Sequence, residues 1–186
     1  MKQGKLIILS SPSGGGKTTV YKRLLTDIKD LRYSVSYTTR PPRPGETHAR
    51  DYFFVTPAEF RRMIRAREFL EWQKVFGRYY GTSAAYVRRF TDAGHNVIMD
   101  LDVKGGCYLK KRLQDLVISI FLMPPSVEEL EKRLYKRATD SSQEIRKRLK
   151  QVRQELKYRT KYDYIVVNDD LERVVKEIET IVQGES

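Results

Sequence analysis

Four short runs of apolar residues divide the chain, and apolar residues recur at helical spacing in the segments between them. The runs occupy 5–10, 97–99, 117–122 and 164–167. Each run is apolar at consecutive positions, which predicts a strand of the kind buried in a parallel sheet. The alternation of such strands with helices predicts an α/β fold, a three-layer core around a mostly parallel sheet.

Three of the intervening segments carry the apolar stripe that forms the buried face of a helix. The stripes are Val20, Leu24, Leu25 and Ile28; Ile145, Leu149, Val152 and Leu156; and Val174, Val175, Ile178 and Ile181. Capping-box spacing predicts helix starts at Ser126 with Glu129, Ser141 with Glu144, and Asp169 with Glu172. Gly94 is a helix stop before the second strand.

The segment 34–83 interrupts this alternation. Its short extended pieces are rich in aromatic residues and are separated by Pro and Gly, which favours a small insertion of antiparallel strands. One helix is expected inside the insertion, because Thr56, Pro57 and Glu59 supply a cap, a first-turn proline and a capping acid.

The composition is typical of one globular domain. The 186 residues are 40% hydrophobic and 32% charged, which argues against disorder. The one cysteine, Cys107, cannot form an internal disulfide and favours a reducing compartment. No stretch is long enough for a membrane span and no signal-peptide pattern occurs, so we expect a soluble, cytoplasmic protein without a membrane partner.

The net charge of +12 has two interpretations. Lysine and arginine neutralise phosphates, so the excess could mark a nucleic-acid binder. It could also reflect solvated helix faces together with arginines that bind small phosphorylated ligands. Much of the excess lies in helical-looking stretches around Arg61, Lys111 and Lys147, and no RNA-binding box or zinc-finger spacing occurs. We favour the second interpretation and expect no nucleic acid as a partner.

The first apolar run leads into a glycine-rich stretch, SSPSGGGKTT at 10–19, which is followed by the first helical stripe. A strand, a glycine turn and a helix in this order bind phosphate, because backbone N–H groups and the helix dipole converge there. The predicted ATP-binding residues are Ser11, Pro12, Ser13, Gly14, Gly15, Gly16, Lys17, Thr18 and Thr19. Lys17 would reach the β- and γ-phosphates, and the Thr18 hydroxyl would ligate Mg²⁺. The alternative is a glycine turn with an exposed lysine.

Ser11 occupies the position where the phosphate-loop pattern has its first glycine. The residue before a proline favours extended backbone, which any L-residue can adopt, so we expect the loop to close normally. The glycines nearest the phosphates, Gly14 to Gly16, are present.

The insertion contains arginines and tyrosines that could form a second phosphate site. Arginine pairs bidentately with phosphate, and tyrosine hydroxyls can complete such a cradle. The candidates are Arg40, Arg43, Tyr52 and Tyr80, with Glu71 in the same segment. Taken alone, each could be a surface charge or a core aromatic.

The order of these motifs resembles the guanylate kinase family over nearly the whole chain. The matching stretches are 34–46, 51–54, 79–82, 100–102, 124–126 with Arg133 and Arg137, and 167–170. The resemblance implies a P-loop core (about 1–33, 95–135 and 161–186), a small mixed α/β GMP-binding insertion (about 34–94) and a helical lid (about 136–160).

The resemblance also implies roles by motif position. Arg40, Arg43, Tyr52 and Tyr80 would hold the GMP phosphate, while Ser36, Glu71, Thr82 and Asp102 would face guanine. Asp100 would lie near the metal and Asn168 near adenine. The lid cations would be Arg133, Arg137 and Arg148, and these three arginines and Lys17 would be the catalytic residues. The chain departs from the family pattern at Ala49 and Ala138, where glycine is common, and at Lys104, where glutamine is usual.

The implied reaction is MgATP + GMP → MgADP + GDP, with Mg²⁺ as cofactor and ATP and GMP as partners. Use of dGMP and the oligomeric state stay open. One alternative is a guanylate-kinase-like domain that no longer catalyses and serves protein interaction; the intact Gly16-Lys17-Thr18 argues against it. The other is a basic P-loop ATPase acting on nucleic acid, but no Asp-Glu pair ends a strand to activate water.

Overall fold

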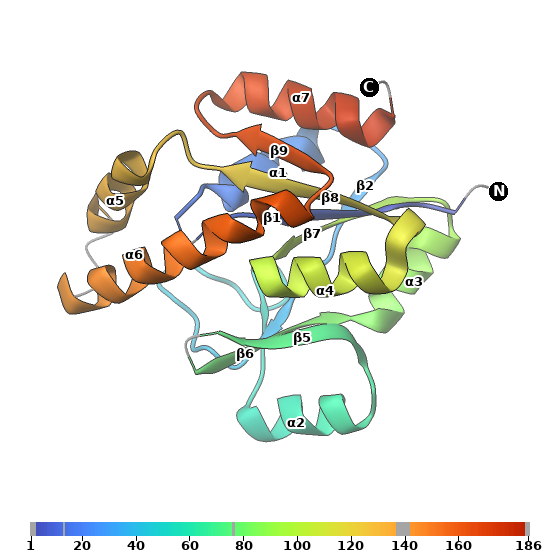
Figure 1. Ribbon diagram of the computed structural model, residues 1–186. Coiled ribbons are helices and arrows are strands. Elements are labelled where there is room, and N and C mark those ends of the chain that lie inside the picture. The colour runs from blue at the N-terminus through green and yellow to red at the C-terminus, as the bar shows by residue number, and fades with distance from the viewer. Residues whose placement is uncertain (1–2, 13, 76, 137–141, 185–186) are drawn as a thin grey trace. The chain divides into compact units, whose positions relative to one another are not determined.

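The computed structural model describes residues 3–12, 14–75, 77–136 and 142–184, with side chains omitted at a few further positions of 133–148. The chain forms two compact units (Figure 1). Unit 1 comprises residues 1–6 and 30–99, and unit 2 comprises residues 7–29 and 100–186. The predicted α/β class is confirmed.

A five-stranded sheet has the strand order β2-β7-β1-β8-β9. Its strands are β1 (Leu6–Ser10), β2 (Leu31–Tyr33), β7 (Asn96–Leu101), β8 (Val117–Met123) and β9 (Tyr164–Val167). The pairs β2–β7 and β8–β9 are parallel. The four predicted runs therefore form strands, and β2 joins them as a short edge strand.

The core of unit 2 surrounds β1, whose Ile7, Ile8 and Leu9 are fully buried. Helix α1 (Lys17–Asp27) follows the glycine-rich loop and buries Val20 and Leu24, two residues of the predicted stripe. Helix α7 (Leu171–Gln183) lies beside α1 and β9 (Figure 1). Burial of these apolar stripes fixes the end of β1 and the start of α1.

Three further α-helices and two short 3₁₀ helices complete the part of unit 2 that is described. Helix α4 (Val103–Leu113) continues into the short 3₁₀ helix η1 (Gln114–Leu116). Helices α5 (Val127–Lys136) and α6 (Ser142–Leu156) pack through Leu130 and Val152, and η2 (Lys157–Lys161) leads to β9. The cap predicted at Ser126 forms, since its Oγ accepts from the Glu129 N–H at 3.1 Å. The cap predicted at Ser141 lies outside the described residues.

Unit 1 contains a four-stranded sheet of order β4-β3-β6-β5. Its strands are β3 (Tyr37–Thr38), β4 (Phe53–Phe54), β5 (Phe69–Val75) and β6 (Arg78–Ser83). Strand β6 is antiparallel to β3 and β5, but β3 and β4 run parallel. The prediction of purely antiparallel strands is wrong at this pair, because the 14 residues between β3 and β4, unlike a tight turn, return the chain in the same direction.

Two helices accompany this sheet: α2 lies between β4 and β5 in the sequence, and α3 follows β6. Helix α2 (Pro57–Arg65) has the predicted start: a capping box joins Thr56 and Glu59, and proline occupies the first turn. Its Phe60 is fully buried and stacks on Phe69 and Tyr79, with ring centroids 4.4 and 5.2 Å away. Helix α3 (Ala84–Asp92) ends before Gly94, whose φ of 88° suits a helix stop.

Two sequence expectations in unit 2 are wrong. Strand β9 is not buried along its length, since Tyr164 and Ile165 are exposed at the edge of the sheet. Helix α7 is capped by Asp170, not Asp169: the Asp170 side chain accepts from the Arg173 N–H at 2.9 Å. Asp169 instead forms an ion pair with the Arg173 guanidinium at 2.6 Å. That ion pair competes with the capping role that the sequence suggested.

Gly106 in α4 yields a prediction about stability. A Cβ there would collide with the Tyr162 hydroxyl and would lie 2.8 Å from Ser10 Oγ. We expect Gly106→Ala to lower the free energy of unfolding by about 1–3 kcal/mol, the usual cost of overpacking, although alanine favours helices. Adding Tyr162→Phe should restore part of the loss, measured by urea unfolding. A Gly106→Ala protein as stable as the parent would contradict this packing.

Candidate active site

The glycine-rich loop joins the buried strand β1 to α1 and has the backbone that a phosphate site requires. Gly14 and Gly16 have φ of 87° and 90°, a region that residues with a Cβ rarely adopt. Gly16 is also the N-cap of α1. The free N–H groups of the first turn and the positive end of the helix dipole therefore face the loop. This arrangement can bind an anion.

Ser11 is buried and is absent from the residues with positive φ, so its backbone is ordinary as expected. Its hydroxyl donates to the Pro12 carbonyl at 3.0 Å and accepts from Lys17 Nζ at 3.3 Å. Lys17 Nζ also donates to the Ser11 carbonyl at 3.4 Å. The lysine therefore lies folded over the start of the loop, held by two weak contacts that a phosphate could replace.

Ser11 also explains why Gly15 is a glycine. Gly15 does not have a positive φ, but a Cβ on it would lie 2.6 Å from Ser11 Oγ and 2.8 Å from Ser11 Cβ. The glycine missing from position 11 is therefore compensated at position 15. The sequence pattern alone did not reveal this dependence.

The loop is held from outside by Asn168. Its Nδ2 donates to the Gly15 carbonyl at 2.8 Å, and its backbone N–H donates to the Met123 carbonyl at 2.7 Å. Asn168 thus links the ends of β8 and β9 to the loop. Thr18 and Thr19 are exposed in the first turn of α1, where their hydroxyls can reach a ligand. Ser13 lies outside the described residues.

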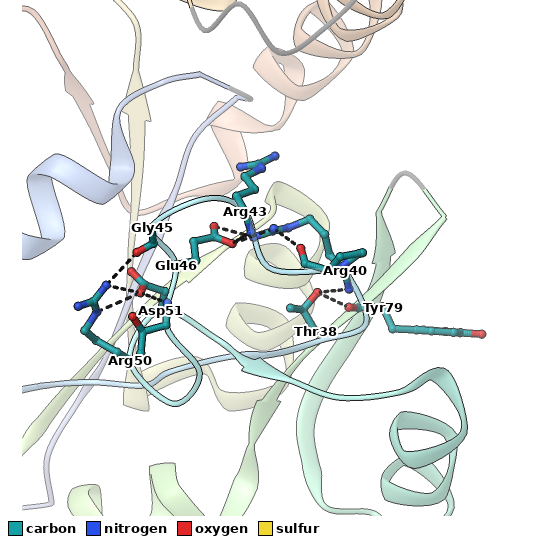
Figure 2. A network of polar contacts seen from close by, with 10 residues as sticks. Thr38, Arg40, Arg43, Gly45, Glu46, Arg50, Asp51 and Tyr79 are labelled. Atoms are coloured by element: carbon teal, nitrogen blue, oxygen red, sulfur yellow. Dashed lines mark hydrogen bonds and ion pairs between the residues drawn. The ribbon is translucent and has the colours of Figure 1, made fainter.

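Unit 1 gathers a second set of predicted residues around Arg40. The guanidinium lies 5.4 Å from the centre of the Tyr52 ring, and the Tyr52 and Tyr80 rings are 6.1 Å apart. The Arg40 N–H donates to Thr38 Oγ1 at 3.2 Å, which in turn donates to the Tyr79 carbonyl at 3.0 Å (Figure 2). These contacts fix the start of the loop that carries Arg40 and bring three of the four predicted phosphate ligands together.

Glu46 holds this arginine in place, and sequence reasoning assigned it no role. Its two carboxylate oxygens accept from Arg40 Nη1 and Nη2 at 2.9 and 2.8 Å, and it also accepts from the Arg43 N–H at 2.7 Å (Figure 2). Glu46 therefore occupies the end of the guanidinium. Further hydrogen bonds of the guanidinium are with neutral oxygens: Nη1 donates to the Pro41 carbonyl at 2.7 Å, and the Tyr80 hydroxyl accepts from the group. Among the described residues, Glu46 is the carboxylate that pairs with Arg40.

Glu46 carries a negative charge at neutral pH. Partial burial acts to raise the pKa of the carboxyl group, but the hydrogen bond and charge of Arg40, with the Arg43 N–H, outweigh burial and lower the pKa. A lowered pKa means that the ion pair stabilises the folded state at neutral pH. That contribution is lost only as the pH falls through the lowered value.

Arg43 contacts Glu46 through its backbone, and its side chain points away from the carboxylate (Figure 2). Nearby, Ala49 has a φ of 64°, in the left-handed region that favours glycine. The family's preference for glycine at this position therefore has a backbone reason, which this chain meets with alanine under strain.

Glu71 is a buried residue of β5, not a solvated charge at a helix end. Its Oε1 accepts from Thr82 Oγ1 at 2.8 Å, and the two residues face each other across β5 and β6. Ser36 is also buried, and its carbonyl accepts from the Phe53 N–H at 2.9 Å. A buried carboxylate is costly unless polar partners meet it, and the Thr82 hydroxyl is one such partner.

The remaining candidates lie in unit 2. Asp102 caps α4, its Oδ1 accepting from the N–H groups of Lys104 and Gly105 at 2.8 and 3.1 Å. Asp100 is the penultimate residue of β7 and is partly buried. Arg137 lies outside the described residues, as do the side chains of Arg133 in α5 and Arg148 in α6. Among described residues, no cluster of three His, Cys, Asp or Glu could hold a metal, and no helix could span a membrane.

A strand, a glycine loop and a helix with Lys17 at its first position define the chain as a P-loop nucleotide-binding protein. A family model described as guanylate kinase matches residues 3–185. The chain belongs to the guanylate kinase family, which confirms the resemblance seen in its motifs.

Relatives and a solved structure agree with this assignment. A guanylate kinase of Caldanaerobacter subterraneus subsp. tengcongensis is 46% identical over 184 residues, covering 99% of this chain and 89% of that protein. One from Wolbachia sp. subsp. Brugia malayi is 45% identical over 183 residues, covering 98% of this chain and 94% of that protein. The crystal structure of guanylate kinase from Anaplasma phagocytophilum superposes with a TM-score of 0.84 at 35% identity, covering 99% and 87%.

The contact between Ser11 and Gly15 predicts a pair of coupled substitutions. Gly15→Ala should weaken ATP binding by about tenfold or more, because its Cβ would push Ser11 off Lys17 and distort the loop. Ser11→Gly alone should leave ATP affinity within about threefold, and the double variant Ser11→Gly/Gly15→Ala should recover most of the loss. Calorimetric titration measures all three, and additive losses in the double variant would contradict the coupling.

The ion pair between Glu46 and Arg40 predicts that substitutions of Glu46 raise the KM for GMP to different extents. Glu46→Ala frees the guanidinium and should raise the KM for GMP by about tenfold, the usual loss of a charge-assisted hydrogen bond, with kcat nearly unchanged. Glu46→Gln, which keeps the shape, should raise KM less. Glu68→Gln is the control, since it breaks an exposed ion pair with Arg62. A lowered KM in Glu46→Gln would mean that Glu46 mainly repels the phosphate.

Proposed function

We propose that this chain transfers the γ-phosphoryl group of ATP to GMP and releases ADP and GDP. The observation that carries the proposal is the glycine loop with Lys17 lying over it, in a chain of the guanylate kinase family. An oxygen of the GMP phosphate attacks the γ-phosphorus, and the bond from that phosphorus to the bridging oxygen of ADP breaks. The attacking oxygen is already anionic, so no strong general base is needed.

Lys17 supports the donor half of this reaction. Its ammonium exchanges the two Ser11 contacts for the β- and γ-phosphates, and the N–H groups of the loop bind the phosphate oxygens. The loop is already in shape, because Gly14, Gly16 and the Asn168 contact fix it. Positive groups fixed in advance stabilise the charge of the transferring group without reorganisation. Asn168 borders the ATP site through the loop, which is compatible with its predicted place near adenine.

Arg40, Tyr52 and Tyr80 support the acceptor half. Glu46 holds one end of the Arg40 guanidinium, and a phosphate of GMP would replace the neutral Tyr80 contact as a charged partner of the same group. The tyrosine hydroxyls add neutral donors. Arg43 would supply the second cation of this site through its side chain. Binding the acceptor phosphate in one orientation lowers the barrier because it prepares an in-line approach.

Glu71 and Thr82 account for the choice of base. Guanine presents N1–H and an exocyclic NH₂ as adjacent donors, and a carboxylate can accept from both. Thr82 donates to one oxygen of Glu71 and so fixes the carboxylate. Adenine has an unprotonated N1 at that place, whose lone pair would face the negative charge. Ser36 and Asp102 are proposed as further contacts of the base.

Mg²⁺ is the proposed cofactor, bound together with ATP. The candidate protein ligands are the exposed Thr18 hydroxyl and the Asp100 carboxylate, the latter through water. This small oxygen donor set fits Mg²⁺, which is usually held by one or two protein groups, waters and substrate phosphates. When bound, the ion neutralises phosphate charge in the transition state.

Arg133, Arg137 and Arg148 are the proposed lid cations, and residues 136–160 the lid. A lid that closes over ATP would add positive charge to the transferring group and exclude water that could hydrolyse ATP. The cytoplasm is the proposed location. The non-catalytic interaction module is not favoured, because the family members that match this chain are named as kinases and Lys17 is present. The nucleic-acid ATPase has no observation in its favour.

The test is formation of ADP that depends on the nucleoside monophosphate. We expect the wild type to prefer GMP over AMP by about 10⁴-fold in kcat/KM, because an unmatched buried carboxylate rejects the wrong base. Glu71→Gln should raise the GMP KM while ATP affinity stays normal. Asp30→Asn, which removes a charge of 87% exposure in the same unit, is the control. Equal kcat/KM for GMP and AMP would refute guanine selection, and the absence of any acceptor-dependent ADP would refute the kinase.

A further inference from the structure

Unit 2 has a groove that the proposed reaction does not use. It measures about 900 Å³ and lies between α4 with η1 on one side and η2 on the other. Its lining residues are Lys104, Cys107, Tyr108, Lys110, Lys111, Gln114, Asp115, Val117, Tyr158, Lys161 and Asp163. None of them belongs to the glycine loop at 10–19 or to the predicted ATP and GMP contacts.

The floor of the groove is a fixed network. Lys110 Nζ forms an ion pair with Asp163 at 2.8 Å and donates to the Lys161 carbonyl at 2.9 Å, so that α4 is joined to η2. Asp163 also accepts from the Ser119 hydroxyl at 2.6 Å. Burial acts to raise the pKa of Asp163, but Lys110 and Ser119 outweigh it and lower the pKa. The carboxylate is therefore charged and neutralises Lys110.

Other lysines of the groove keep their charge open to a ligand. Lys104, Lys111 and Lys161 form no ion pair with any carboxylate that the structure describes. Lys104, Cys107, Tyr108 and Lys111 follow the spacing i, i+3, i+4, i+7, which places them on one face of α4. The two lysines are separated by about 10.5 Å along the helix axis, with Tyr108 between them.

Aromatic rings occur on both walls. Tyr108 on α4 is 49% exposed, so its ring is accessible to a ligand. Tyr158 on η2 is partly buried, and the Lys161 ammonium lies 4.9 Å from the centre of its ring. Flat apolar faces with ammonium groups beside them match a ligand that has a planar ring system and phosphates.

We propose that this groove is a second nucleotide-binding site, whose occupant is a free nucleoside di- or triphosphate. The base stacks against Tyr108 or Tyr158, and Lys104, Lys111 and Lys161 bind the phosphates. The volume lies within the usual range for small-molecule sites, about 300–1,000 Å³, which favours a mononucleotide over a long polymer. Lys104 stands where the family resemblance expects glutamine, so part of this charge is a property of this chain.

Cys107 makes the proposal testable because it lines the groove and is the one cysteine of the chain. Partial burial raises the pKa of its thiol, so its reaction with an uncharged alkylating reagent is slow and sensitive to what covers it. The rate of iodoacetamide labelling, followed by mass spectrometry of the full chain, is measured against ADP concentration. We expect saturating ADP to slow labelling by about tenfold, since the bound form is protected. Adenosine has the base without the phosphates, and inorganic triphosphate has the phosphates without the base. Each should protect Cys107 less than ADP does at equal concentration.

Substitutions separate the groove from the glycine loop, which also binds ADP under the proposed function. Lys104→Gln/Lys111→Gln should lose the protection of Cys107, whereas Lys17→Ala should keep it. Lys22→Gln/Lys176→Gln removes the same charge at exposed positions elsewhere in unit 2 and should behave as wild type. Because labelling needs no turnover, this result stands apart from the kinase assay.

Three outcomes would overturn the proposal. ADP could fail to protect Cys107 in the wild type. Protection could persist undiminished in Lys104→Gln/Lys111→Gln, which would trace it to the glycine loop. A single-stranded oligouridylate of about twelve nucleotides, within the 4–16 nucleotides that such sites cover, could protect at lower concentration than ADP, and the occupant would then be RNA.

Discussion

The glycine loop depends on the burial of β1, because the end of that strand sets where the loop begins. Ile7, Ile8 and Leu9 are fully buried, so the point where Ser10 ends the strand is fixed within the core of unit 2. From there the chain must turn and begin α1 at Lys17 within six residues. The loop makes that turn with positive φ at Gly14 and Gly16, a conformation that residues with a Cβ rarely adopt and that can form an anion-binding concavity. Apolar burial therefore determines the geometry of a polar site.

The cluster of Arg40, Tyr52 and Tyr80 in unit 1 has a different requirement. A long, flexible cation must be held in one orientation before its ligand binds. Glu46 meets this requirement by binding one end of the Arg40 guanidinium, whose further hydrogen bonds are with neutral oxygens of Pro41 and Tyr80. An arginine can serve two anions at once in this way, because its five donors lie in one plane. Ordering the side chain in the free protein lowers the entropy that must be lost on binding. The opposing cost is a negative charge near the incoming phosphate.

The sequence predicted those features that depend on local pattern. Runs of apolar residues correctly predicted four strands, and the capping box of Thr56 and Glu59 correctly predicted the start of α2. The sequence could not predict that β9 lies at a sheet edge, because a run of apolar residues looks the same for an edge strand and a central strand. Tyr164 and Ile165 are exposed because β9 is an edge strand. The spacing of Asp169 and Glu172 likewise predicted the wrong cap for α7, because Asp170 caps the helix while Asp169 pairs with the Arg173 guanidinium.

Residues whose role depends on a particular side-chain contact could not be predicted from the pattern, whether the partner is near or far in sequence. Family motifs named Arg40, Tyr52 and Tyr80, but Glu46 gained a role only when its two oxygens were seen on Arg40. The dependence of Gly15 on Ser11 also required a distance. The lysine groove combines 104–117 with 158–163, segments separated by a strand and two helices. No sequence window could have joined them.

The distribution of carboxylates bears on the meaning of the +12 charge more than its total does. Glu46 and Asp163 each neutralise one buried or half-buried cation, Arg40 and Lys110, and in both places they fix its position. In unit 2, the neighbouring Lys104, Lys111 and Lys161 form no ion pair with a carboxylate that the structure describes. At cellular salt, the interaction between exposed charges is largely screened beyond about 8–10 Å. Dispersed surface lysines therefore contribute little to specific binding. Positive charge acts on a phosphate where a paired carboxylate has already ordered the surrounding side chains, and both units have such a place.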